Sequence, residues 1–203
     1  MPNQARIAMV EKAGADFEIV ETTIDDPGAH EVLVELAAVG VCHTDLAVQN
    51  GDLPTNFPVV LGHEGAGTVK AVGEHVRDLA PGDKVVLSYG SCGHCRPCEE
   101  GDPAYCLDFE ALNFMNKRQG DEDAVFADGP NAAFFQQSSF ATLSIAHERN
   151  VVKIEEDVDI ALLGPLGCGI QTGAGAVLRT AKPQACSALL VSGVGSVGMS
   201  AVM

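Results

Sequence analysis

The sequence predicts an α/β protein in which a mostly β domain comes first and the opening of a doubly wound α/β domain comes last. Two patterns support this. Short apolar and alternating runs, separated by Gly, Pro and Asp turns, recur through residues 5–154. The run ACSALLVSG at 185–193 is instead apolar throughout, as in a buried parallel strand. We place the two domains at 1–160 and 161–203.

The first domain is predicted to consist of short strands joined by turns, within 5–10, 17–24, 31–41, 57–73, 81–87 and 138–154. Between the third and fourth strands we expect a short helix that is capped by Thr44 or Asp45 and ends at Gly51. The stretch 107–139 is expected to be an irregular loop, and loops this long are usually functional.

The second domain begins with predicted helical segments around a glycine-rich centre at 155–181. After the apolar strand at 185–193, GVGSVG forms a G-x-G-x-x-G loop through Gly193, Gly195 and Gly198, and SAVM begins a helix. Strand, glycine loop and helix bring a pyrophosphate to a helix N-terminus. A doubly wound sheet needs several further strands, so we expect the first part of a longer protein.

Composition disfavours several classes of function. The net charge is −16, from 28 acidic against 12 basic residues, and no Lys/Arg cluster is present to bind nucleic acid or an anionic membrane. No apolar stretch is long enough for a signal peptide or a membrane span. Seven cysteines without a secretion signal indicate metal ligation in a reducing cytoplasm.

Four of these cysteines lie in one lobe at 90–108, with the spacing C-x2-C-x2-C-x7-C: Cys92, Cys95, Cys98 and Cys106. Four thiolates close a tetrahedron around Zn²⁺ and leave no open position, so the predicted site is structural. Two disulfides are the alternative, which a reducing compartment disfavours. His94, inside the loop, is expected to be a solvated turn residue.

A catalytic zinc needs three protein ligands and one open position. Cys42 follows a strand end, and Cys168 is framed by glycines that let backbone approach a ligand. Cys186 lies in the apolar strand, where we expect a buried and inert thiol. His63, between glycines, is the best imidazole candidate, although a lone histidine is usually only a satisfied polar residue.

Six motifs occur in the order and spacing of one known family: GVCHTD, GHEGAGTV, PGDKVV, the four-cysteine loop, GCGIQTGAGA and GVGSVG. From about residue 7 to residue 203 the chain resembles the zinc-dependent alcohol dehydrogenases of the medium-chain dehydrogenase family. YCLDFEALNF and FFQQSSFATLSIAHERNVVKI look most like the aryl- or benzyl-alcohol members. The resemblance implies a GroES-like catalytic domain followed by the start of a Rossmann nucleotide-binding domain.

The resemblance assigns the catalytic zinc to Cys42, His63 and Cys168. It implies that Asp45 hydrogen-bonds the His63 ring and fixes its tautomer, and that Glu64 lies behind the metal.

The same resemblance assigns roles in proton and coenzyme handling. Thr44 would accept the alcohol proton, and His43 would face the coenzyme pyrophosphate. Thr172 would touch the nicotinamide, and Val197 would pack behind its ring. Ala47 stands where many relatives carry a histidine that passes the proton to solvent, so water or another group must complete that relay.

The implied reaction is zinc-assisted hydride transfer between a primary, aromatic or benzylic alcohol and NAD, with two zinc ions per chain. NADP is not excluded, because the acid that reads the ribose would lie beyond residue 203. Ser88 and Leu53 occupy pocket positions, and a small Ser88 leaves room for an aromatic ring. As in relatives, a homodimer or homotetramer is expected for the full-length protein.

Two other readings stay open. One is a glutathione-adduct (S-(hydroxymethyl)glutathione) formaldehyde dehydrogenase of the same family, which needs basic groups that are scarce near the expected pocket. The other is a non-catalytic zinc-ribbon module that binds protein or nucleic acid. That module explains the four-cysteine loop but leaves Cys42, His63, Cys168 and GVGSVG without a role, and a metal count would separate it from the enzyme.

Overall fold

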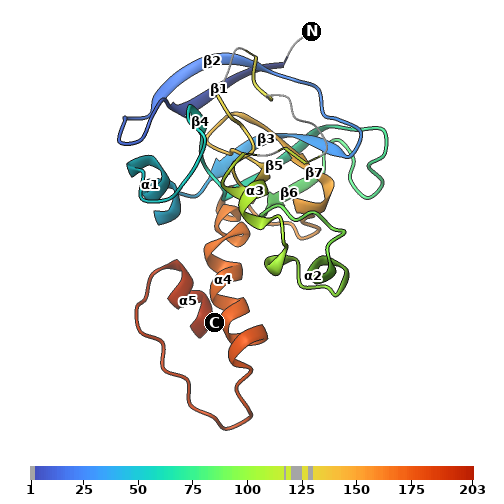
Figure 1. Ribbon diagram of the computed structural model, residues 1–203. Helices are drawn as coiled ribbons and strands as arrows, with labels where there is room; N and C mark the ends of the chain where they lie inside the picture. The colour runs from blue at the N-terminus through green and yellow to red at the C-terminus, as the bar shows by residue number, and fades with distance from the viewer. Residues whose placement is uncertain (1–2, 117, 120–124, 128–129) are drawn as a thin grey trace.

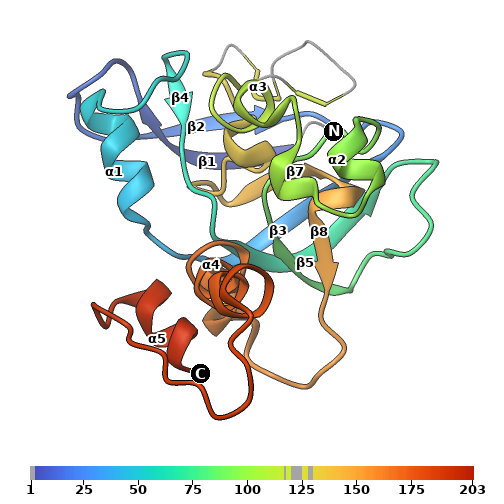
Figure 2. The same ribbon diagram turned by 60° about the horizontal axis from the view of Figure 1, so that its bottom comes forward.

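The computed structural model describes residues 3–116, 118–119, 125–127 and 130–203. A β-rich part contains the N-terminus, and helix α4 (Gly169–Gly175) runs out from it with α5 (Ser196–Val202) packed alongside (Figure 1). Figure 2 shows α4 nearly end-on, with α5 and the C-terminus to one side of it. No helix in the described ranges is long and apolar enough to cross a membrane.

Two antiparallel sheets form the β-rich part. The strand orders are β2-β1-β4 and β7-β3-β5-β6-β8. The strands are β1 (Asn3–Val10), β2 (Glu18–Ile24), β3 (Glu31–Val39), β4 (Val59–Val60), β5 (Gly65–Val72), β6 (Lys84–Leu87), β7 (Leu143–His147) and β8 (Val151–Lys153). Each strand segment predicted between residues 5 and 154 contains one or two of them.

Strand β3, which lies between β7 and β5 in the larger sheet, is covered on both of its faces. Leu33 joins the cluster between the two sheets, which includes Ile7 and Phe126. The alternate residues Val32 and Val34 join a second cluster on the opposite face. All three β3 side chains are at most 1% exposed. Successive side chains of a strand point to opposite faces, so one apolar run serves two cores.

Helix α1 (His43–Asn50) occupies the predicted position and ends, as expected, at Gly51, whose φ is 85°. The predicted cap is wrong, because Cys42 is the N-cap residue. Asp45 instead lies one turn inside the helix, and its carboxylate accepts a hydrogen bond from the Cys42 backbone N–H at 3.0 Å. The Asp45 carboxylate still accepts from a backbone N–H at the start of the helix, but it does so from a position inside the first turn.

The remaining helical elements are short. Helix α3 (Phe109–Asn113) lies within 107–139, which was predicted to be irregular; residues 117, 120–124 and 128–129 of that stretch lie outside the described residues. The other elements are α2 (Arg96–Glu99), the 3₁₀ turns Pro103–Tyr105, Phe134–Gln136, Glu148–Asn150, Ile160–Leu162 and Gly164–Gly167, and the π turn Ala176–Ala181.

The strand predicted at 185–193 is not formed, and that prediction is wrong. A strand exists through backbone hydrogen bonds to a neighbour, and this segment pairs with none of the eight strands in the described ranges. Leu190 is 93% exposed and Val194 is 77% exposed. Cys186 is exposed as well, at φ 67°, which contradicts the expected buried thiol. The glycine loop and the helix after it do form, with α5 starting at Ser196.

A buried ion pair fixes the start of β3. Arg118 Nε donates to Glu31 Oε1 at 2.8 Å, and its Nη2 also donates to Glu31 Oε2. Their side chains are 10% and 8% exposed. The Glu31 carboxylate also accepts from the Gly28 backbone N–H at 2.8 Å. The pair therefore ties residue 118 to the first residue of β3.

We predict that Glu31→Gln lowers the free energy of unfolding by about 3 kcal/mol, because the neutral amide replaces a buried carboxylate that accepts from both the Arg118 guanidinium and the Gly28 N–H. Urea denaturation followed by circular dichroism measures this. Glu100→Gln breaks the exposed Arg96–Glu100 pair, whose side chains are 85% and 57% exposed, and should leave stability unchanged. Equal losses of stability in Glu31→Gln and Glu100→Gln would contradict the conclusion that the buried pair of Glu31 and Arg118 stabilises the fold.

Candidate metal centres and active-site cleft

The four-cysteine lobe brings its sulfurs together, with the four Sγ atoms all within 4.8 Å of one another. Cys95 Sγ lies 3.5 Å from Cys98 Sγ and 4.0 Å from Cys106 Sγ. No pair of the seven cysteines forms a disulfide. Backbone N–H groups point at the sulfurs: Cys95 N lies 3.3 Å from Cys92 Sγ, and Leu107 N lies 3.5 Å from Cys95 Sγ. His94 is exposed, as expected.

The charge balance of this lobe fits a bound dication. Burial raises the pKa of Cys92 to about 12, whereas the Leu107 N–H lowers the pKa of Cys95 to about 6. Without a cation, sulfurs this close together cannot all give up their protons. Four sulfur donors with no open position match structural Zn²⁺.

A second donor set joins three distant parts of the chain. Cys42 caps α1, His63 lies between β4 and β5, and Cys168 immediately precedes α4. Their ligand atoms lie within 4.8 Å of one another, and the two sulfurs are 3.9 Å apart. The structure thus brings together the three residues that the family resemblance assigns to one metal.

The His63 ring is held in one orientation by a buried carboxylate. Its Nδ1 lies 3.0 Å from Asp45 Oδ1, and the side chains of His63 and Asp45 are 1% and 0% exposed. Asp45 Oδ1 also accepts from the Gly62 N–H at 3.0 Å. With the proton on Nδ1, the Nε2 lone pair is free, and within the described ranges this buried atom has no hydrogen-bond partner. One orphaned imidazole nitrogen and two sulfurs fit the three-ligand set of a catalytic Zn²⁺.

Electrostatics couples the three donors. The neighbouring Cys168 thiol and His63 ring lower the pKa of Cys42 to about 3, and the nearby Cys42 sulfur together with burial raises the pKa of Cys168. Burial by itself lowers the pKa of His63, but the Asp45 carboxylate and the nearby Cys42 sulfur outweigh it and raise the pKa to about 9. One thiolate is therefore stable here on its own, and a second one requires a further positive charge.

Glu64 follows His63 in the chain and reaches the backbone next to Cys168. It is 5% exposed, and its Oε1 accepts from the Gly169 N–H at 3.2 Å. A Cβ at Gly40 would lie 2.0 Å from Glu64 Oε2, and one at Gly164 would lie 2.4 Å from the Glu64 carbonyl oxygen. Glycine at position 40 therefore leaves room for the Glu64 carboxylate, and glycine at position 164 leaves room for the Glu64 backbone carbonyl.

The residues predicted to handle the proton and the coenzyme lie on α1, α4 and α5. Thr44 Oγ1 is 3.6 Å from Cys42 Sγ, and His43 is exposed beside it at the start of α1. Thr172 is exposed on α4, and Val197 is 45% exposed on α5. The glycine loop is tight, since a Cβ at Gly198 would lie 2.0 Å from the Gly193 carbonyl oxygen.

A cleft of about 610 Å³ opens at Cys168 and is lined by Thr172 and by the rings of Tyr89, Phe109 and Phe135. Phe135 stacks on the His63 ring, with centroids 4.6 Å apart and planes at 25°. The sequence predictions missed this aromatic wall. The available signal was FF at 134–135 in a chain with only 5% aromatic residues.

Neither of the two predicted pocket residues is among the residues that line this cleft, although both lie next to ones that do. Leu53 packs with Phe134 and Phe135 in one apolar cluster. Ser88 is half-buried, and its Oγ accepts from Gln171 Nε2 at 3.0 Å, next to the cleft-lining Tyr89.

Residues 28–156 match the family model described as alcohol dehydrogenase GroES-like domain. The match covers more than half of the chain, so the chain belongs to this family.

Named relatives agree with the family. The chain is 47% identical over 203 residues to a geraniol dehydrogenase of Castellaniella defragrans, a match that covers 98% of this chain and 54% of the relative. The crystal structure of an alcohol dehydrogenase zinc-binding domain protein from Burkholderia ambifaria superposes with a TM-score of 0.93 at 47% identity, over 100% of this chain and 55% of that one. The crystal structure of a benzyl alcohol dehydrogenase from Acinetobacter calcoaceticus superposes with a TM-score of 0.93 at 46% identity, over 98% of this chain and 54% of that one. The chain therefore spans about half the length of these relatives.

We predict that Asp45→Asn weakens metal binding at the Cys42 site by ~10–100-fold, because an amide cannot accept from all three N–H groups and no longer fixes the His63 tautomer. Competition with a chromophoric chelator measures the affinity. Asp52→Asn, at an exposed position just after α1, is the matched control. Identical affinities for both variants would remove the positioning role of Asp45.

Proposed function

We propose that the protein containing this chain interconverts primary aromatic alcohols and their aldehydes, with a nicotinamide coenzyme as hydride acceptor. The observation that carries the proposal is the orphaned Nε2 of His63, buried beside the sulfurs of Cys42 and Cys168 at the floor of the cleft. Three fixed donors with room on one side are the ligand set of a catalytic rather than a structural zinc. When bound, zinc would make an alcohol hydroxyl acidic enough for its carbon to release hydride to the nicotinamide.

The chain's own residues have separate tasks in this proposal. Thr44 accepts the hydroxyl proton beside Cys42, and Asp45 keeps the His63 tautomer fixed. Ala47, half-buried on α1, offers no group to pass the proton on, so water or another group completes the relay. Glu64 supplies negative charge behind Cys168.

An aromatic substrate is favoured by the walls of the cleft. Tyr89, Phe109 and Phe135 present ring faces and edges to a flat, unsaturated substrate, and Phe109 meets Phe135 edge-on at 6.4 Å and 89°. Such contacts favour arenes beyond their buried area. The names of the geraniol and benzyl alcohol dehydrogenase relatives agree with an unsaturated primary alcohol.

The coenzyme and the assembly are parts of the same proposal. We place the coenzyme pyrophosphate at the glycine loop 193–198, at the start of α5, with Thr172 and Val197 near the nicotinamide. We propose NAD as the coenzyme, and the test below measures activity with NADP as well. We also propose the domain division at about residue 160, a second zinc ion in the four-cysteine lobe, a homodimer or homotetramer, and a reducing cytoplasm in which seven thiols persist.

Metal analysis and kinetics on the same sample test the proposal. We expect two zinc ions per chain, oxidation of benzyl alcohol with NAD or NADP, and no requirement for glutathione. Cys168→Ser should remove one zinc and at least 10²-fold of kcat while leaving the four-cysteine zinc in place. A single zinc in the unmodified protein, or activity only with glutathione, would replace the proposal by one of the two alternative readings.

Ser88→Phe is expected to shift preference from benzyl alcohol toward ethanol. A phenyl ring at this half-buried position is expected to reach into the cleft that its neighbour Tyr89 lines, where it would take space that an aromatic substrate needs and ethanol does not. The ratio of kcat/KM for the two alcohols should fall by about 10-fold or more. Ser88→Ala, which removes only the Gln171 hydrogen bond, should preserve the ratio. An unchanged ratio in Ser88→Phe would place the substrate elsewhere.

A further inference from the structure

The four-cysteine lobe also forms one wall of the cleft. Residues 101–105, between the third and fourth cysteines, line one side. The opposite side consists of α4 and the π turn after it, including Thr172 and Arg179. Cys168 lies between the two walls. The sequence predicts only a structural role for this lobe, but the lobe also forms part of the boundary of the active-site cleft.

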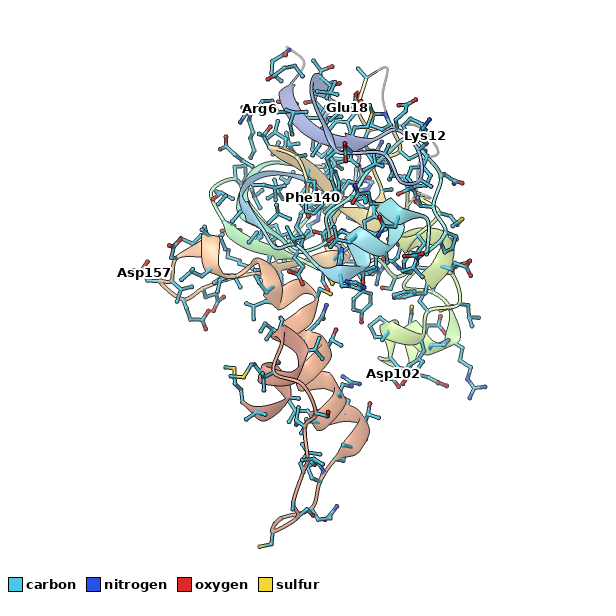
Figure 3. All side chains as sticks on the ribbon, turned by 90° about the vertical axis from the view of Figure 1, so that its left-hand side faces the viewer. Arg6, Lys12, Glu18, Asp102, Phe140 and Asp157 are labelled. Atoms are coloured by element: carbon cyan, nitrogen blue, oxygen red, sulfur yellow. The ribbon has the colours of Figure 1, made fainter. Side chains whose placement is uncertain are left out.

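An ion pair joins these two walls. Arg179 Nη2 donates to Asp102 Oδ1 at 2.8 Å across 77 residues of sequence, and the two side chains are 70% and 52% exposed. Asp102 lies at the lower end of the lobe, beside the C-terminal helical part (Figure 3). The contact is thus at the solvent side of the cleft, away from its floor at Cys168.

The wall that carries Asp102 is positioned by the sulfur cluster. Tyr105 N donates to the Asp102 carbonyl at 3.0 Å, and Cys106 N donates to the Pro103 carbonyl at 3.1 Å. The turn Pro103–Tyr105 therefore runs directly into Cys106, which is 5% exposed and belongs to the four-thiolate group. Gly101 starts the turn at φ 87°. The metal in the lobe would hold Asp102 in place, and the π turn after α4 carries Arg179.

We propose that Asp102 and Arg179 form a latch that closes the mouth of the cleft, and that this latch sets how wide a substrate can enter. The substrate part of this inference rests on the proposed function. An exposed ion pair is weak and is screened by salt, so it opens readily and can act during turnover without locking the site. Tyr105, 72% exposed on the same wall, presents its ring to a substrate passing the latch.

Kinetics with two alcohols of different width test the latch. Asp102→Asn and Arg179→Gln should each lower KM for 2-naphthylmethanol by 3- to 10-fold while changing KM for benzyl alcohol less than 2-fold. The charge-swapped double variant, Asp102→Arg with Arg179→Asp, should restore the selectivity of the unmodified protein. High salt should move the unmodified protein, but not the single variants, toward wide substrates. Equal changes for both alcohols, or no restoration in the double variant, would overturn the proposal.

The matched control is the Arg96–Glu100 pair. It lies in the same lobe at 2.7 Å and is exposed, and neither residue lines the cleft. Glu100→Gln should leave both KM values unchanged. If it reproduces the effect of Asp102→Asn, lobe charge rather than the latch would be responsible, and the proposal fails.

Tyrosine fluorescence gives a readout that does not need turnover. The chain has no tryptophan and two tyrosines, Tyr89 and Tyr105, and both line the cleft. Opening the latch should raise acrylamide quenching of their emission by at least 1.5-fold in Asp102→Asn and Arg179→Gln, with Glu100→Gln unchanged. Unchanged quenching in the latch variants refutes the latch. Increased quenching in a protein that oxidises no alcohol supports the latch and refutes the proposed function.

Discussion

The buried carboxylate of Asp45 is the constraint on which the metal centre depends. A carboxylate that is 0% exposed is stable only if its oxygens accept hydrogen bonds, and here they accept from Cys42 N, Gly62 N and His63 Nδ1. Those three donors come from the start of α1 and from the turn between β4 and β5. Satisfying one charge therefore fixes a helix end, a turn and an imidazole tautomer together. The two donor atoms of Cys42 and His63 are brought to one point by the same interaction that stabilises the fold.

The third donor, Cys168, reaches this point because the backbones around it pack without side chains. Gly167 lies against the carbonyl oxygen of Leu87 at the end of β6, where a Cβ would be 2.0 Å away. Gly164 and Gly40 lie against Glu64 in the same way. The residues just before α4 thus pack directly against the backbone of the larger sheet. Glycine at these positions is a packing requirement, not a source of flexibility.

Much of this arrangement could be predicted from the sequence, and the failures have a common cause. Alternation and turn residues located the strands up to residue 154, because each pattern is complete within a few residues. The four-cysteine lobe could be predicted equally well, since all four cysteines lie in one loop. Spacing alone could not bring Cys42, His63 and Cys168 together, as 126 residues separate the two cysteines; only the likeness to a family did. The segment 185–193 has the composition of a strand, but composition carries no information about whether a partner strand is present. Phe135 was missed because its place over His63 follows from a left-handed backbone, φ 50°, that its local sequence does not signal.

The exposed apolar segment before α5 has a consequence for what can pack against it. Leu189, Leu190 and Val194 meet water, and the peptide groups around them are not engaged in a sheet. Exposed apolar side chains beside unpaired peptide groups form a surface on which a further strand can pair. A strand that paired with this segment would cover the side chains of Leu190 and Val194 together with the peptide groups between them.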